Sequence, residues 1–472
     1  MGMRSKIVSV LLSVAGLSLL MAPAVATEVT IDGAQRYQTI EGFGTCLIAW
    51  VDRFRALYRT EEFQQIYVEG VGCNMLRVNM WGPTFETPTE DWTKIRYQDF
   101  DMNANGGRPQ IFVDFGQGIR KLNPDVKIIG TVWSPPSWMK VNQSITDARS
   151  DAIRAHSYGK INNRVDPKYY KHFCKWMVEY VKLHEQQEVP FYAVSPGNEV
   201  QFTQSFESCV WDGKDFVTIV IMLREMLDAE GYEHVKIFGP ETMTSHLYEG
   251  GTGSYVRAVL DNPRVLKALD VFATHGYEDG VKAEMSATSS RQFWDLIAQT
   301  GKPFWITEGG TGGHDWPTPI QKGIGNALHN ALVAGNCSAF VPWQITEGRE
   351  STHGIMVMDT YTPKTYTAMH YTKSIRPGAV RIAATPGFDT VQVGAFLHDG
   401  TGELTIVALN PTDQPQALNL TFHNLGDFAS LKARRTSASE NFRDVGDVTV
   451  TDNGATSDMT PQSIVTLTAK IN

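Results

Sequence analysis

The 472-residue chain carries 51 acidic and 42 basic side chains, which gives a formal net charge of −9 at pH 7. This acidity, without a basic cluster, argues against nucleic acid or an anionic membrane as a partner. The length is sufficient for two domains with sizeable cores. The five cysteines are scattered without a CxxC pair. No disulfide framework can be read from their spacing, and we expect most of them to be small buried apolar residues.

The first residues predict a secretory signal peptide over residues 1–26. Arg4 and Lys6 precede an apolar run over residues 7–21, and residues 23–26 have the small side chains of a cleavage site. The run is short for a bilayer span, and no later segment reaches the length of a membrane helix. We therefore expect a secreted or periplasmic protein that has no membrane partner after cleavage.

Short apolar segments alternate with helical patterns between residues 40 and 375. Continuous apolar runs are typical of parallel strands buried on both faces. The eight expected strands are Phe43–Ile48, Met75–Met80, Lys127–Ser134, Phe191–Ser195, Val235–Pro240, Val271–Tyr277, Pro303–Thr307 and Ala339–Ile345. Eight strand–helix units predict an α/β fold, a (β/α)8 TIM barrel over residues 40–375. A doubly wound open sheet is the alternative, but no Gly-rich phosphate loop follows an early strand.

The pattern changes after residues 376–378, where strand-like segments follow one another without helices. They are Val391–Val393, Leu404–Leu409, Ala417–Leu420, Val448–Val450 and Ile464–Leu467, separated by Gly, Asn, Asp and Pro turns. This pattern predicts a small all-β sandwich side domain over residues 376–472. The early segment 27–39 is also strand-like, and we expect it to join the side domain.

Two of the expected barrel strands lead to a glutamate. Glu199 follows the fourth strand, and Glu308 follows the seventh before a glycine pair. In a barrel these strand ends share one face, and two carboxylates on that face suit glycoside hydrolysis. The bland alternative is that each glutamate only caps the next helix. A carboxyl separation of roughly 5–5.5 Å would favour retention of configuration, and roughly 6.5–9.5 Å would favour inversion.

Aromatic residues gather at the other strand ends. They are Trp81, Trp133, Trp138, Tyr277 and Trp343. Any one of them could be a core residue, but five together favour a cleft in which rings pack against sugars. His275 either orients a carboxylate or is a satisfied polar residue, and Glu241 and Glu347 could also face the cleft. The chain has no HxH or HExxH motif, so we expect no metal or other cofactor.

Several motifs together resemble glycoside hydrolase family 30, of the clan A barrel enzymes, nearest its bacterial xylanase-like branch. The motifs are GFGTCLIAW, LRVNMWGP, TVWSPPSWMK, SPGNEVQ, FESCVWDGKDF, HGYED, WITEGG and SIRPGAVRI. The resemblance covers nearly the whole mature chain and implies a retaining mechanism. It implies that Glu199 is the general acid/base and Glu308 the nucleophile, and that Asn198 binds the 2-hydroxyl of the sugar under attack.

The chain departs from that family at several positions. Val200 replaces the usual proline and Gly197 a common glutamine, but neither change removes a carboxylate. Arg349 differs in placement from the Tyr/Arg arrangement that binds a glucuronic acid branch in glucuronoxylan-cleaving members, so uronic acid recognition stays open. We expect a secreted retaining endo-β-glycosidase whose partner is a polysaccharide or oligosaccharide, most simply β-1,4-xylan or glucuronoxylan. The alternatives are a β-1,6-glucanase or β-1,6-galactanase and a non-catalytic carbohydrate-binding protein.

Overall fold

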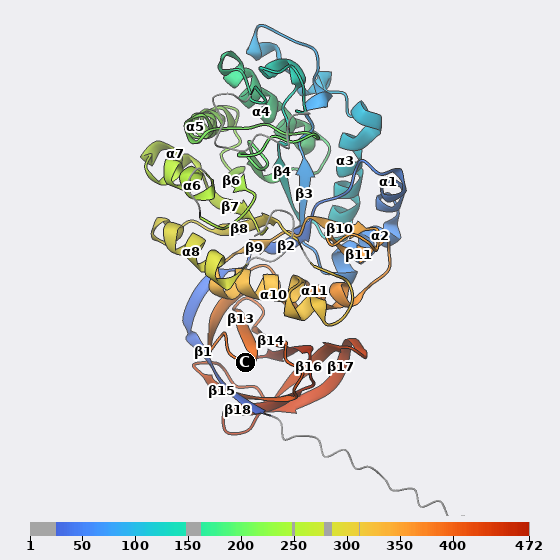
Figure 1. Cartoon of the computed structure of the whole chain (residues 1–472), viewed down its shortest axis with the longest axis vertical. Helices are drawn as coiled ribbons and strands as arrows, with labels where there is room; N and C mark the ends of the chain where they lie inside the picture. The colour runs from blue at the N-terminus through green and yellow to red at the C-terminus, as the bar shows by residue number, and fades with distance from the viewer. Residues whose placement is uncertain (1–24, 148–161, 248–250, 278–285, 311, 472) are drawn as a thin grey trace, which may run out of the picture.

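The computed structural model describes residues 25–147, 162–247, 251–277, 286–310 and 312–471. A barrel surrounded by helices and a separate β domain lie one above the other along the long axis (Figure 1). The signal peptide expected over residues 1–26 lies outside the described residues except for its last two positions. The architecture of a (β/α)8 barrel with a β side domain is confirmed.

Parallel strands close the barrel, and the expected order is confirmed. The eight strands described are β2 (Gly42–Thr45), β3 (Met75–Asn79), β4 (Lys127–Thr131), β5 (Phe191–Ser195), β6 (Lys236–Thr242), β7 (Val271–His275), β8 (Phe304–Glu308) and β9 (Ala339–Phe340). The last strand is shorter than expected because Pro342 has no backbone N–H for the ladder. Its continuation forms β10 (Gln344–Glu347), which pairs in parallel with β11 (Gly354–Val357).

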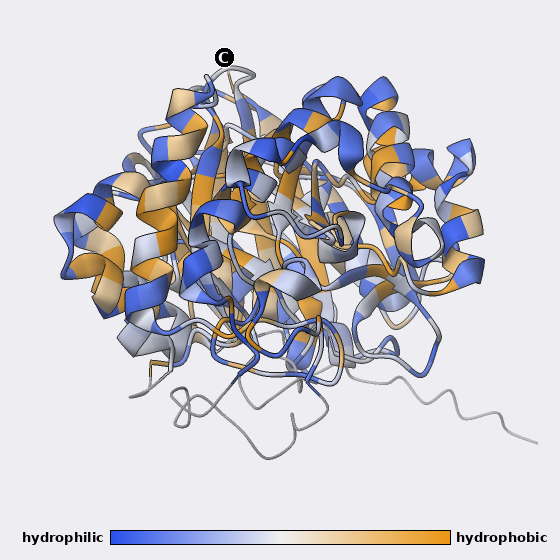
Figure 2. Ribbon diagram, turned by 90° about the horizontal axis from the view of Figure 1, so that it is seen from above, coloured by the Kyte–Doolittle hydropathy of each residue, from blue (hydrophilic) through white to orange (hydrophobic). Residues whose placement is uncertain are grey.

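Helices surround the strands, with their apolar faces turned inward and their polar faces outward (Figure 2). They are α1 (Asp52–Tyr58), α2 (Glu61–Gln65), α3 (Ala104–Leu122), α4 (Tyr170–Gln186), α5 (Gly213–Ala229), α6 (Thr252–Leu260), α7 (Pro263–Ala268), α8 (Ala287–Ile297), α9 (Thr318–Gln321), α10 (Ile324–His329) and α11 (Pro363–Thr372). Asp166 caps the turn before α4 by accepting the Lys168 N–H. Asp212 is the N-cap of α5 and accepts the Asp215 N–H.

The side domain is one hydrogen-bonded sheet. In sheet order, its nine described strands are β17 (Glu440–Thr449), β16 (Ser430–Ser437), β19 (Ser463–Lys470), β14 (Glu403–Asn410), β13 (Gln392–His398), β12 (Val380–Thr385), β1 (Val25–Thr39), β15 (Gln416–His423) and β18 (Gly454–Met459). Leu431 of β16 lies near one edge of the sheet and Leu418 of β15 near the other edge, yet both belong to the same apolar core. The sheet therefore curls around this core. β1 lies in this sheet between β12 and β15.

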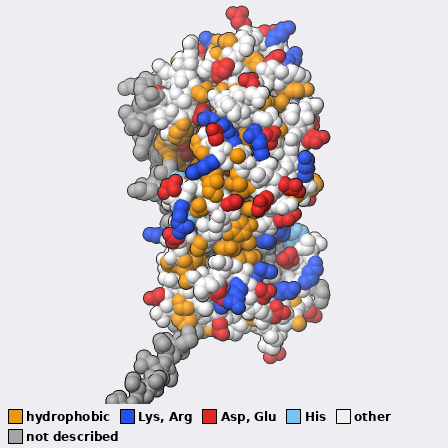
Figure 3. Space-filling model, turned by 90° about the vertical axis from the view of Figure 1, so that its right-hand side faces the viewer, with side chains coloured by type: hydrophobic (Ala, Val, Ile, Leu, Met, Phe, Trp, Pro, Cys, Tyr) orange, Lys and Arg blue, Asp and Glu red, His pale blue; other side chains and the backbone are white. Residues whose placement is uncertain are grey.

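On the face shown in Figure 3, acidic and basic side chains are interspersed. In the described part of the chain, no helix is both long and apolar enough to cross a bilayer. All five cysteines are buried, as expected for most of them, and each is a free thiol.

Candidate active site

The ends of β5 and β6 place two glutamates in an unusual backbone conformation. Glu199 has φ +48° and Glu241 has φ +49°. These angles lie in the left-handed region of the backbone, which residues other than glycine rarely adopt. The Glu199 N–H donates to the Glu241 carbonyl at 2.9 Å, so one strand end supports the other. Such strain persists only where the surroundings enforce it, and it is concentrated at functional sites.

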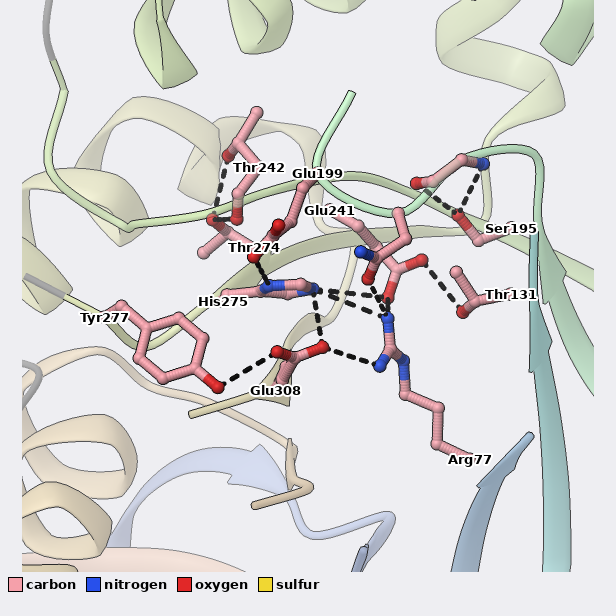
Figure 4. A network of polar contacts seen from close by, with 12 residues as sticks. Arg77, Thr131, Ser195, Glu199, Glu241, Thr242, Thr274, His275, Tyr277 and Glu308 are labelled. Carbon is pink, nitrogen blue, oxygen red and sulfur yellow. Dashed lines mark hydrogen bonds and ion pairs between the residues drawn. The ribbon is translucent and has the colours of Figure 1, made fainter. Parts of the chain in front are cut away.

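The two carboxylates expected from the sequence converge on one imidazole (Figure 4). His275 at the end of β7 places Nδ1 3.3 Å from Glu199 Oε1 and Nε2 3.8 Å from Glu308 Oε2. One oxygen of each glutamate and one nitrogen of His275 lie within 4.8 Å of one another. This closeness matches the short carboxyl separation of retaining glycosidases, roughly 5–5.5 Å, and not the wider gap of inverting ones.

Arg77 is the residue that connects the site, and the sequence reasoning missed it. Its guanidinium donates to Glu308 Oε2 at 2.9 Å, to Asn198 Oδ1 at 2.6 Å and to Glu241 Oε1 at 3.1 Å. The side chain lies on β3 and is fully buried. The sequence contained a signal for this role, because an arginine inside an otherwise apolar strand needs acidic partners when it is buried.

Glu241 is a buried ion-pair partner of Arg77. Both of its oxygens are occupied, one by Arg77 and the other by the Thr131 hydroxyl at 2.9 Å. Its side chain is fully buried, whereas Glu199 and Glu308 keep exposures of 8% and 6%. The two slightly exposed carboxylates are therefore the ones a substrate can reach.

Glu308 accepts a hydrogen bond at each of its two carboxylate oxygens. Tyr277 donates its hydroxyl to Glu308 Oε1 at 2.9 Å, while Arg77 holds the other oxygen. Burial raises the pKa of Glu308, and the Glu199 carboxylate raises it further, against the opposing effects of His275, Arg77 and Tyr277. The donors Arg77 and Tyr277 oppose this rise, because they stabilise the ionised form of Glu308.

Asn198 is oriented by the same arginine. Because its Oδ1 accepts from Arg77, the amide nitrogen is the group left to donate elsewhere. The backbone N–H of Asn198 also donates to the Val132 carbonyl at 2.8 Å, which ties it to the end of β4. This arrangement presents an amide donor beside Glu199.

An aromatic cavity of about 560 Å³ adjoins the site through Trp133, although neither Glu199 nor Glu308 is among its lining residues. Trp133 lies under the Arg77 guanidinium, 4.4 Å from ring centroid to Cζ, and also lines the cavity. Trp343 lies between Trp133 and Trp50, with ring centroids 5.9 Å and 6.1 Å away. Trp81 completes this aromatic wall. The sequence reasoning missed Trp50, which is 44% exposed although it ends an otherwise buried apolar motif.

Two of the expected binding residues belong neither to this cavity nor to the polar network around the carboxylates. Trp138 packs against Phe85 and Tyr169 and donates its indole N–H to the Phe85 carbonyl at 3.0 Å. Arg349 is exposed and pairs with Asp315 at 2.7 Å. The structure therefore brings His275, Tyr277 and Asn198 into the network around the glutamates and places Trp81, Trp133 and Trp343 in the adjoining cavity, but Trp138 and Arg349 lie in neither.

Glu199, His275 and Glu308 also have the donor set of a small metal site. The Arg77 guanidinium, 2.9 Å from Glu308, disfavours a divalent cation there because it already supplies the compensating positive charge. The arrangement suits acid–base and nucleophilic chemistry by two carboxylates better than metal coordination.

Comparison with known proteins agrees with this geometry. The family model described as "Glycosyl hydrolase family 59" matches residues 63–394. Glucuronoxylanase XynC of Bacillus subtilis (strain 168) is 23% identical over 470 residues, covering 95% of this chain and 94% of that protein. An endo-1,6-beta-D-glucanase of Neurospora crassa is 26% identical over 186 residues, covering 36% of each chain.

A solved structure shares the whole architecture. It is a glycoside hydrolase family 30 subfamily 8 xylanase of Clostridium acetobutylicum, with a TM-score of 0.73, 20% identity and coverage of 94% of this chain and 99% of that one. The expected resemblance to family 30 is thereby confirmed for the fold. Since the family 59 model spans most of the barrel and its two carboxylates, the chain belongs to glycosyl hydrolase family 59 and is a glycoside hydrolase.

Proposed function

We propose that the protein is a retaining endo-β-glycosidase acting on β-1,4-xylan by double displacement. The observation that carries this proposal is the convergence of Glu199 and Glu308 on His275, with one oxygen of each carboxylate and one imidazole nitrogen within 4.8 Å of one another. Two carboxyl groups this close leave no room for the water that an inverting enzyme places opposite its acid.

In the first step, Glu308 attacks the anomeric carbon while Glu199 protonates the oxygen of the departing sugar. Arg77 and Tyr277 hold both oxygens of Glu308, so the carboxylate is fixed for in-line attack before substrate arrives. In the second step, Glu199 takes a proton from water, which hydrolyses the glycosyl–Glu308 ester and retains configuration. The amide nitrogen of Asn198 donates to the 2-hydroxyl of the reacting sugar.

The substrate assignment rests on similarity and on the aromatic cavity. XynC and the Clostridium enzyme are named for xylan cleavage, and both match almost the whole length of this chain. The wall formed by Trp50, Trp343 and Trp133 offers flat apolar surfaces to successive pyranose rings. A cavity that extends beyond the reacting sugar suits cleavage within a polymer.

A β-1,6-glucan is the second candidate substrate. It is supported by the Neurospora relative, whose match covers only 36% of this chain, so xylan is preferred. Product analysis on xylan, glucuronoxylan, β-1,6-glucan and β-1,6-galactan separates these substrates. We expect xylo-oligosaccharides from xylan, and hydrolysis of only the β-1,6-linked polymers would reverse the assignment.

Two variants test the residue roles. Glu308→Ala should abolish turnover, and azide should rescue it on an activated aryl glycoside, giving the glycosyl azide of inverted configuration. Glu199→Gln should lose hydrolysis of unactivated polymer far more than hydrolysis of a substrate with a good leaving group. A protein that binds xylan equally well in all forms, without wild-type turnover, would instead be a carbohydrate-binding protein.

We also propose that the chain is exported, on the strength of its charged and apolar first 26 residues. Cleavage after Ala26 would remove the first two residues of β1, which pair with Gln416 and Ala417. The remaining strand still has six paired positions with β15, from Thr27 to Asp32, so we expect the side domain to keep its sheet. The intact mass of protein recovered from the medium or periplasm identifies the cleavage point, and a full-length mass would contradict this proposal.

A further inference from the structure

The aromatic cavity contains one ion pair that the reaction itself does not use. Arg108 lies at the start of the regular part of α3, and Glu207 lies in the segment that follows Glu199. Both line the cavity. Of the described residues around it, these two are the ones that carry a full charge, and every other lining residue is neutral. The cavity thus has a mostly apolar, uncharged lining with one positive and one negative side chain.

The two groups are close but not hydrogen-bonded. Arg108 Nη1 lies 3.9 Å from Glu207 Oε1, with side-chain exposures of 28% and 21%. This distance is longer than a hydrogen bond, so each group keeps capacity for a ligand. The Arg108 Nε is buried without a hydrogen-bond partner among the described residues, and the guanidinium lies 5.4 Å from the centroid of the Trp81 ring.

Two exposed aromatic side chains line the cavity beside this pair. Trp50 is 44% exposed and Phe206 is 50% exposed. Exposed rings of this size are costly to hydrate unless a ligand covers them. Their flat faces suit a pyranose ring, whose hydroxyl edge would then meet the donor Arg108 and the acceptor Glu207.

We propose that Arg108 and Glu207 form a specificity pair that selects an uncharged sugar in a subsite next to the reacting ring. The proposal deepens the endo-xylanase function proposed above and rests on it. A sugar hydroxyl both donates and accepts, so it satisfies Arg108 and Glu207 at once. A uronic acid carboxylate placed against Arg108 would face the Glu207 carboxylate at the same time, and that repulsion disfavours it.

The other arginines near the barrel mouth have acidic partners of their own. Arg349 is paired with Asp315 at the surface, and Arg77 is enclosed by Glu308 and Glu241. Among the described residues of the site, Arg108 is therefore the arginine that remains to bind a glucuronic acid branch. The nearby Glu207 carboxylate compensates its charge. We infer that cleavage does not depend on a glucuronic acid branch.

The test uses Arg108→Gln and Glu207→Gln, which replace each charge by an amide of similar shape. The matched controls are Arg264→Gln and Glu225→Gln, an exposed Arg–Glu pair on the outer helices α7 and α5, 3.0 Å apart. The substrates are unbranched xylan, glucuronoxylan and an aryl β-xyloside that carries one sugar. We measure kcat and KM for each.

The wild type should cleave unbranched xylan at least as efficiently as glucuronoxylan. Each cavity variant should raise the KM for unbranched xylan about tenfold or more, with a much smaller change on the aryl xyloside, and the controls should match the wild type. Glu207→Gln should also shift preference toward glucuronoxylan, because Arg108 then lacks its competing carboxylate. Loss of glucuronoxylan cleavage alone in Arg108→Gln would overturn the proposal, as would variants that behave like the controls.

A binding measurement separates this proposal from the proposed function. In the Glu308→Ala background, calorimetry with a neutral xylo-oligosaccharide reports on the subsite without turnover. Weaker binding after adding Arg108→Gln or Glu207→Gln supports the specificity pair even if the wild type hydrolyses no xylan. Unchanged binding in both double variants overturns it even if the wild type is an active xylanase.

Discussion

Two polar clusters at opposite ends of the same barrel have nearly the same components. At the mouth, Glu308 is held by Arg77 and Tyr277 at 2.9 Å each. At the floor, Glu41 accepts from Tyr192 at 2.7 Å and from Lys236 at 3.1 Å. Each end therefore combines a glutamate, a tyrosine hydroxyl and a basic side chain.

The difference between the ends lies in the second carboxylate. Burial pulls the pKa of Glu41 upward, but Lys236, Tyr192, Trp305 and Lys127 together hold it below its ordinary value. The pKa of Glu308 is raised instead, by burial and with Glu199 opposing the donors. A single well-paired acid stabilises the fold, whereas two acids sharing one environment are poised for proton transfer.

The largest expected contrast is between the two glutamates. Glu308→Ala should lower kcat by on the order of 10⁴-fold, because the attacking group is gone. Glu41→Gln should leave kcat nearly unchanged and lower the free energy of unfolding by about 2 kcal/mol, because Tyr192, Lys236 and Trp305 lose the charged acceptor that they share. Steady-state kinetics and denaturant unfolding measure the two effects. A comparable loss of kcat in both variants would mean that the floor contributes to turnover.

The basic partners give the next contrast. Arg77→Gln should lower kcat by about 100-fold, because Glu308 and Asn198 lose their shared anchor. It should also destabilise the fold by about 3 kcal/mol, since Glu241 and Glu308 would be left buried without a counter-charge. Lys236→Gln, whose side chain is 32% exposed, should cost about 1 kcal/mol. Equal losses of unfolding free energy at both positions would contradict this ranking.

The tyrosines should differ in pH dependence. The ionised form of Glu308 is the nucleophile, so activity is lost as the pH falls through a pKa raised above 4.5. The Tyr277 hydroxyl stabilises the ionised form, so Tyr277→Phe should move the acid limb of kcat/KM about one pH unit upward. Tyr192→Phe should leave the limb in place, because Tyr192 contacts Glu41 at the floor. A downward shift in Tyr277→Phe would refute this account.

The smallest expected effect defines how far the mouth extends. Trp343→Ala should raise the KM for polymer about fivefold, because the ring between Trp50 and Trp133 is removed. Trp138→Ala should leave that KM unchanged and lower thermal stability, because its indole packs on Phe85 and Tyr169. The KM on xylan and the midpoint of thermal unfolding, measured for both variants, check these two expectations. A raised KM in Trp138→Ala would extend the mouth to that loop.

Local pattern was sufficient to predict the barrel and its two glutamates. A strand buried on both faces is apolar along its length, and its end is marked by Pro, Gly or a polar residue, so Glu199 and Glu308 could be placed before any contact was known. The side-domain strands β12, β16 and β18 were missed. Strands with mixed or polar composition, such as Lys432-Ala433-Arg434-Arg435 in β16, give little local signal.

By itself, the sequence determined which segments of the barrel form strands and which strand ends carry acids, because those properties depend on neighbours only a few positions away. Only the tertiary structure decided that Arg77 holds Glu308, 231 positions away, that Trp50 joins the aromatic wall, and that Trp138 does not. Closing the barrel is what fixes such pairs, since partners on different strands meet only when every strand is in register.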